Sequence, residues 1–201
     1  MKNAKKALIL VLCAALLVGA SVMGTLAYLT SKTDVVENTF TVGKVEITMD
    51  ESKVTEYGVI DGNTRVTEND YKLLPGHTYT KDPTIHVAAG SEACYLFVEV
   101  FSSLPEDVLK VADLMTANGW TQLPSNPKVW YKANLVDARE AAQDVLVFGT
   151  FTIAAGATYT DLAGAEDTVL DLVAYAIQAD GFNDAPSAWT AAVGAGNITN
   201  P

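Results

Sequence analysis

Histidine and cysteine most often carry acid–base, nucleophilic and metal chemistry, and this chain of 201 residues has two of each. His77 follows a Pro-Gly pair and His86 lies in an alternating stretch, and neither has an H-E-x-x-H or comparable metal-binding neighbourhood. The two imidazoles could approach each other in a folded sheet, but a surface or turn position is the simpler interpretation. Cys94 shares one face of an expected strand with Leu96 and Val98 and has no base near it in sequence, so we expect a small buried side chain.

Sequence signatures of an enzyme are also missing. The chain has no G-x-S-x-G, no phosphate-binding loop and no dinucleotide fingerprint. We therefore expect that the protein is not an enzyme and has no catalytic residue, no cofactor and no bound metal.

Acidic clusters and aromatic residues could also form ligand sites. Hard cations bind oxygen ligands, and the acidic clusters that could supply them are Asp50-Glu51, Glu68-Asn69-Asp70 and Glu166-Asp167. None has the spacing of a known calcium loop, so solvated loops are the better interpretation. A carbohydrate platform would need exposed aromatic rings, and the candidates are Trp120, Trp130, Tyr131 and Trp189. Such residues more often fill a β core.

The first 27 residues have the organisation of an export signal. Three lysines within the first six residues precede an apolar run without a charge over 7–24, and small residues lead up to Ala27. We expect cleavage between Ala27 and Tyr28. An uncleaved anchor is the alternative, because about 18 apolar residues can just span a bilayer.

Charge and cysteine content favour a secreted protein. The whole chain has 13 basic and 24 acidic residues, net −11, and cleavage would remove three lysines and leave −14. This acidity argues against nucleic acid and anionic membranes as partners. Cys13 lies in the apolar run, so the mature chain would keep only Cys94 and could form no internal disulfide. Such a domain suits export from a Gram-positive cell.

The remainder of the chain has the pattern of short strands separated by turns. The expected strands are 39–49, 54–60, 65–74, 79–87, 93–101, 120–123, 128–136, 145–153 and 169–178. The first should change faces at Gly43, because Phe40 and Val42 have one parity and Val45 and Ile47 the other.

Turn and helix signals complete the prediction. Asp61-Gly62-Asn63 and Pro75-Gly76 are expected to reverse the chain. The S-x-x-E spacing of residues 103–106 predicts a capping box, followed by a helix that stops at Gly119. Asp184 should cap a short terminal helix, and 137–144 is either a short helix or a polar connection. The pattern favours an all-β, antiparallel, jelly-roll-like β-sandwich with one helical insertion over residues 38–201.

Three segments resemble one known family. The stretch GTLAYLTSKTDVVENTFTVGKVEITM (24–49) resembles the junction of TasA- and camelysin-type proteins, which are exported with SipW-dependent signals. The resemblance lies in its Gly-Thr-Leu-Ala end, the following apolar pair and the later Thr-Phe-x-x-Gly pattern. LLPGHTYTKDPTIHVAAGSEACYLFVEV (73–100) and LVAYAIQADGF (172–182) resemble later blocks of that family. Leu26 stands where Trp is common there, and residues 105–144 are not diagnostic.

The resemblance implies a subunit of an extracellular fibre in a biofilm matrix or on a Gram-positive cell surface. In such fibres the N-terminal segment of one subunit adds as a strand to the sheet of the next, and a head-to-tail contact that does not close gives a filament. The implied partners are further copies of the chain, the signal peptidase during export and other matrix proteins, without nucleic acid. Residues 28–37 would form an exposed leader. The implied donor-strand residues are Tyr28, Leu29, Val35, Val36, Phe40 and Val42.

Two alternatives stay open at this point. One is a camelysin-like surface metallopeptidase, for which His77 and His86 would be the only imidazoles. The other is a monomeric carbohydrate-binding module displayed on the surface.

Overall fold

The fold of the described residues is built almost entirely of antiparallel strands. The computed structural model describes residues 43–163 and 170–198. The chain divides into two units, 1–41 and 42–201, and all described residues belong to the second. Strands make up 41% and helices 14% of the structure, and the pairings between its strands are antiparallel. The expected all-β, antiparallel class is therefore confirmed.

One sheet has the strand order β2-β1-β4-β9. Its strands are β1 (Ile47–Val54), β2 (Ile60–Val66), β4 (Thr84–Val87) and β9 (Gln143–Leu146). Apolar and polar residues alternate along β1 and β4, so that Ile47 and Ile85 face the core and Asp50 and His86 face outward. Val45, Ile47 and Met49 all pack against the core, as their shared parity predicts. Strand β1 begins at Ile47, and residues 43–46 precede it without regular strand structure.

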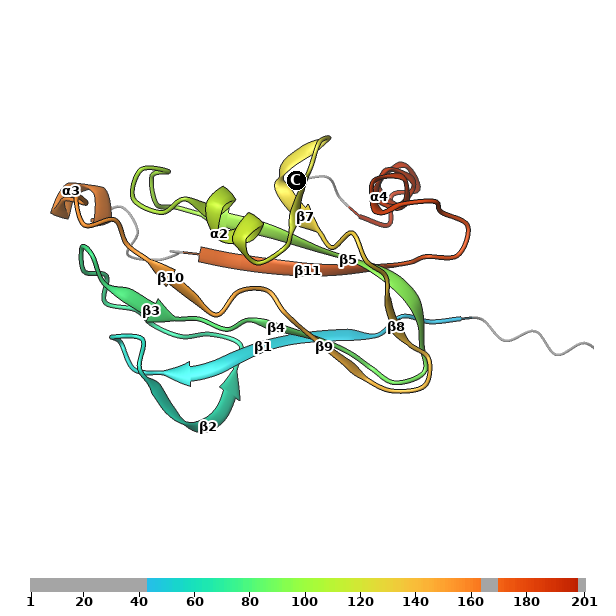
Figure 1. The fold of residues 1–201 in the computed structure, drawn as a ribbon, viewed down its shortest axis with the longest axis horizontal. Coiled ribbons are helices and arrows are strands. Elements are labelled where there is room, and N and C mark those ends of the chain that lie inside the picture. The colour runs from blue at the N-terminus through green and yellow to red at the C-terminus, as the bar shows by residue number, and fades with distance from the viewer. Residues whose placement is uncertain (1–42, 164–169, 199–201) are drawn as a thin grey trace, which may run out of the picture. The chain divides into compact units, whose positions relative to one another are not determined.

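A second sheet has the order β11-β5-β7-β6, with β8 also paired to β5. Its strands are β5 (Ser91–Ser102), β6 (Thr121–Leu123), β7 (Asn126–Tyr131), β8 (Val136–Ala138) and β11 (Leu170–Gln178). Figure 1 shows this sheet facing the first one, with α4 (Ala185–Gly194) on its other side. Helix α2 (Val111–Ala117) lies beside β6, and its buried Met115 belongs to the cluster between the two large sheets. A short two-stranded sheet joins β3 (Thr78–Thr80) to β10 (Thr150–Thr152), and α3 (Tyr159–Leu162) follows β10.

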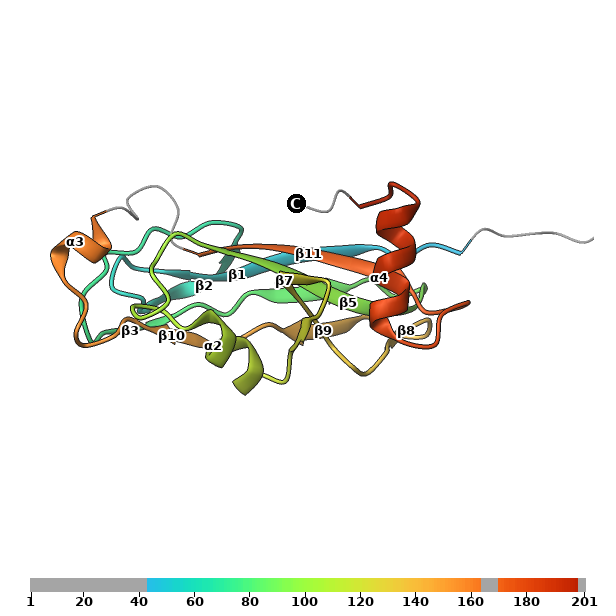
Figure 2. The same ribbon diagram turned by 90° about the horizontal axis from the view of Figure 1, so that it is seen from above.

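Strand β5 is buried on both faces, which explains its nearly continuous apolar sequence. Leu96 and Val98 belong to the cluster between the two large sheets. Tyr95 and Phe97 belong to a second cluster, which α4 covers with Ala188 and other residues. Helix α4 runs across β5 and β11 (Figure 2). The structure is therefore three layers deep at this end of the sheet.

The predicted strands 54–60 and 65–74 are wrong in their bounds. Residues 55–59 form the turn between β1 and β2, and the chain after Val66 has no regular strand before Thr78. Asp61-Gly62-Asn63 does not reverse the chain. It lies within β2, where the register against β1 shifts in a β-bulge, and Gly62 has a φ of 78°.

The predicted start of the first helix, directly after residues 103–106, is also wrong. Helix α2 begins at Val111, and its N-cap, Lys110, makes no side-chain capping hydrogen bond. The stop at Gly119 is confirmed by a φ of 74° directly after the helix. The cap at Asp184 is confirmed as well, because its side chain accepts a hydrogen bond from the Ser187 backbone. Residues 137–144 contribute to β8 and β9 instead of forming a helix.

None of the helices in residues 43–163 and 170–198 has the length and apolar character needed to cross a membrane.

Candidate functional site: a free strand edge

The residues predicted for cleavage and strand donation lie outside the described part of the chain. They are Ala27, Tyr28, Leu29, Val35, Val36, Phe40 and Val42. The described residues therefore bear on the receiving side of a strand-addition contact, which must be an open sheet edge.

The two histidines occupy different surroundings. The Nε2 atom of His77 lies 3.0 Å from the carbonyl oxygen of Tyr57, and its ring meets the ring of Tyr79 at 4.5 Å between centroids. His86 instead contacts two carboxylates on the outer face of the first sheet. The described residues contain no group of three or more histidine, cysteine or acidic side chains that could hold a metal. The structure therefore gives each imidazole other partners and shows no shared metal site.

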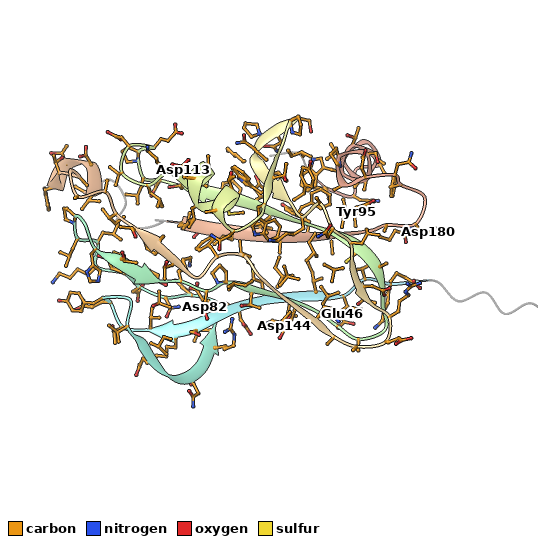
Figure 3. The ribbon with its side chains drawn as sticks, viewed as in Figure 1. Glu46, Asp82, Tyr95, Asp113, Asp144 and Asp180 are labelled. Carbon is orange, nitrogen blue, oxygen red and sulfur yellow. The ribbon has the colours of Figure 1, made fainter. Side chains whose placement is uncertain are left out.

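His86 links three neighbouring strands. Its Nδ1 atom lies 2.7 Å from Asp144 Oδ1 on β9, and its Nε2 atom lies 2.9 Å from Asp50 Oδ1 on β1. Arg65 on β2 contacts Asp50 and also lies 3.3 Å from Asp82 Oδ2. Asp82 and Asp144 are labelled on this side of the structure in Figure 3. Hydrogen bonds to Asp50 and then to Asp144 raise the pKa of His86.

The His86 contacts predict a loss of stability as the pH rises. A raised pKa in the folded state means that protonated His86 contributes fully below the ordinary value of about 6.5. That contribution disappears as the pH rises through the raised value. We expect the free energy of unfolding to fall by about 1 kcal/mol more in the native protein than in His86→Gln between mildly acidic and alkaline pH. Urea titrations across this range measure it.

His77→Gln is the matched control, because it removes the other imidazole and should keep the pH dependence. Asp50 does not interfere in this window. Burial raises its pKa, but hydrogen bonds from His86 and Arg65 lower it more. Equal pH dependence in His86→Gln and the native protein would contradict the assignment.

Several of the acidic and aromatic candidates have structural roles in the described residues. Asp50 contacts His86 and Arg65, whereas Glu51 accepts hydrogen bonds from Lys81 and Asn69. The cluster Glu166-Asp167 lies outside the described residues. Trp120, Trp130 and Trp189 are all buried, with at most 3% of each residue exposed. These tryptophans cannot form an exposed sugar-binding platform.

Strand β11 presents the longest open edge among the described strands. It pairs with β5 over nine consecutive positions without a register shift and has no other partner strand in the described residues. Its sequence LDLVAYAIQ contains one charged residue, Asp171, and neither Pro, Gly nor Lys. Natural proteins protect free edges with bulges, prolines and lysines. Strand β11 has none of these features.

The backbone groups on that free edge follow from the pairing. The Ala179 N–H donates to the Ala93 carbonyl, which makes these two residues a hydrogen-bonded pair. Because such pairs alternate in antiparallel sheets, the odd-numbered residues of β11 bond to β5. The even-numbered residues, from Leu172 to Gln178, therefore point their N–H and C=O groups toward the open side.

The other edges are short or protected. Strand β2 carries the bulge at Gly62 and the charge of Arg65, and β9 has only four residues, including Asp144. Strands β3, β6, β8 and β10 have three residues each. Beside β10, the Ala154 N–H donates to the Val108 carbonyl at 2.9 Å, which covers part of that edge. Strand β11 is thus the edge best suited to accept another strand.

Sequence reasoning identified β11 as a strand but not as an edge. Its single charge over nine residues was the available signal, but edge position depends on the strand order.

Comparison of the chain with protein-family models, curated proteins and solved structures found no match.

Proposed function

We propose that this chain is a secreted structural subunit of extracellular fibres, of the kind implied by its resemblance to the TasA and camelysin family. In this proposal the signal peptide is cleaved after Ala27, and residues 38–201 form a jelly-roll-like sandwich. The N-terminal segment of one copy then adds as a strand to its neighbour. The proposal is supported mainly by one observation, the long open edge of β11.

The chemistry of the two partners is complementary. An added strand gains backbone hydrogen bonds to the open side of β11 and places alternate side chains on its two faces. The segment from Tyr28 to Val42 contains the apolar residues needed for such alternation. Since the donor and the acceptor belong to different regions of the chain, the contact is head-to-tail and can continue into a filament.

Removal of the donor segment tests the proposal directly. The mature chain that begins at Tyr28 should form filaments, whereas the chain that begins at Glu37 should stay a folded monomer because it has lost four of the six donor-strand residues. Negative-stain microscopy and analytical ultracentrifugation measure the difference. A chain with residues 28–36 replaced by Gly and Ser is the control for length and should also stay monomeric. Filaments from the truncated chain would overturn strand donation.

A further inference from the structure

Glu51, Lys81 and Asn69 form a buried contact that the fibre proposal does not use. Glu51 faces the interior from β1 and is only 4% exposed. The Lys81 Nζ atom lies 2.8 Å from Glu51 Oε2 and 3.1 Å from Oε1. The Asn69 Nδ2 atom donates to the same Oε1 at 2.9 Å. One carboxylate oxygen therefore holds both an amine and a side-chain amide.

The Asn69 amide is held firmly by the backbone of β1. Its Oδ1 atom accepts a hydrogen bond from the Val54 N–H at 2.9 Å, and its Nδ2 atom also donates to the Ser52 carbonyl at 2.9 Å. A backbone N–H on the carbonyl oxygen of an amide stabilises negative charge that develops there when a nucleophile attacks the carbon. The amide is therefore oriented as an electrophile.

The surroundings of Lys81 exclude most water. Its side chain is 11% exposed, and Nζ lies 5.6 Å from the centre of the Tyr71 ring. The Tyr71 ring itself packs at right angles against Tyr79 and close to Phe151. A site with little water favours the formation of an amide over its hydrolysis.

We infer that Lys81 and Asn69 form an intramolecular isopeptide bond, with Glu51 as the group that moves the protons. Lys81 Nζ gives a proton to Glu51 and attacks Asn69 Cγ, while the Val54 N–H holds the developing oxyanion. The Nζ–Cγ bond forms and the Cγ–Nδ2 bond breaks. Nζ loses two protons in all, and both leave with the departing nitrogen as ammonium. No oxidant or metal is needed.

The bond would serve as a covalent cross-link in a domain whose described residues include a single cysteine and so no internal disulfide. It joins the irregular segment after β2 to the connection between β3 and β4 and closes a short loop between residues 69 and 81. Such a link restricts the unfolded chain as a disulfide does. The lone cysteine of the described residues, Cys94, is free and buried, and burial raises its pKa to about 11.

Intact-mass spectrometry of the purified full chain tests the inference without reference to fibres. The bond releases one ammonia, so the protein should be lighter by about 17 Da than its sequence requires. A protease digest should also yield a branched peptide joining Asn69 to Lys81. A native protein of full mass, with Lys81 recovered in an unbranched peptide, would overturn the inference.

Three variants locate the chemistry. Lys81→Arg, Asn69→Ala and Glu51→Gln should each restore the full mass, the first two by removing a reacting atom and the third by removing the proton carrier. Lys53→Arg is the matched control and should keep the deficit, because Lys53 is an exposed lysine of β1, the strand of Glu51, and pairs with Asp61 instead. A deficit that persists in Lys81→Arg would assign the lost ammonia to another reaction, such as succinimide formation, and would also overturn the inference.

Discussion

Ala174→Pro is expected to block filament formation and leave the monomer folded. Ala174 is an even-numbered residue of β11, so its N–H points to the open side and not to β5. Proline removes that donor and places a ring where the added strand must lie, whereas edge strands tolerate proline on the side that faces solvent. One lost hydrogen bond and the steric block should cost roughly 1–3 kcal/mol, which is about tenfold or more in assembly affinity.

Proline at the neighbouring position, Val173, is expected to affect the folded monomer instead of the assembly contact. Val173→Pro removes an N–H that bonds to β5, so it should destabilise the monomer itself by about 3 kcal/mol. Ala174→Ser keeps the N–H and should assemble like the native chain. The critical concentration for filaments and the urea midpoint of the monomer measure the two effects separately. Native assembly by Ala174→Pro would remove β11 as the acceptor edge, even if residues 28–36 prove necessary.

The strands with the strongest apolar patterns were predictable from the sequence. The expected strands 93–101 and 169–178 correspond closely to β5 and β11. Both segments have nearly continuous apolar sequences, which local pattern alone identifies as strands. Turn glycines were predictable where no tertiary contact competes. Gly90 and Gly119 take positive φ values at the expected ends of elements.

The region from Val54 to Leu74 could not be predicted because distant contacts decide it. Gly58, with a φ of 73°, provides the turn between β1 and β2, and a Cβ there would lie 2.7 Å from the Tyr79 Cα atom. Tyr79 is far along the chain, so no local sequence pattern predicts a turn at Gly58 in preference to one at Asp61-Gly62-Asn63.

The late start of α2 has the same kind of cause. Val108 and Leu109 lie before the helix and are buried in the core, with 3% and 4% of each residue exposed. Their N–H groups donate to the Pro105 carbonyl in a separate turn. Burial of these side chains outweighs the local preference for a helix that begins directly after residues 103–106.

The candidate sites depend even more on tertiary structure. An open edge exists only once the strand order is known, and among the described strands only β5 is hydrogen-bonded to β11. Glu51, Asn69 and Lys81 come from three separate segments, and in the sequence Glu51 and Asn69 belong to acidic clusters whose pattern is typical of solvated loops. Only the register of β1 turns Glu51 inward, because one residue of slip would turn it to solvent.

Trp189→Ala is expected to cause the largest loss of monomer stability. Trp189 is 2% exposed and anchors α4 on the outer face of β5 and β11. Its ring centre lies 5.0 Å from that of Phe97 and 5.4 Å from that of Tyr175. Removal of such a side chain leaves a cavity and costs about 3–5 kcal/mol, a large part of the 5–15 kcal/mol that stabilises a typical domain. Urea unfolding followed by circular dichroism measures this change.

The same substitution should also weaken assembly, because Tyr175 and Ile177 of β11 pack in the cluster that α4 covers. If α4 detaches, β11 becomes less rigid. The binding of an added strand must then also order β11, which lowers the assembly affinity. Trp189→Phe keeps most of the contact area and should lose much less stability. Thr190→Ala, at an exposed position of the same helix, should lose little. A loss below about 1 kcal/mol in Trp189→Ala would show that α4 contributes little to this face, since a well-packed aromatic residue costs more than that to remove.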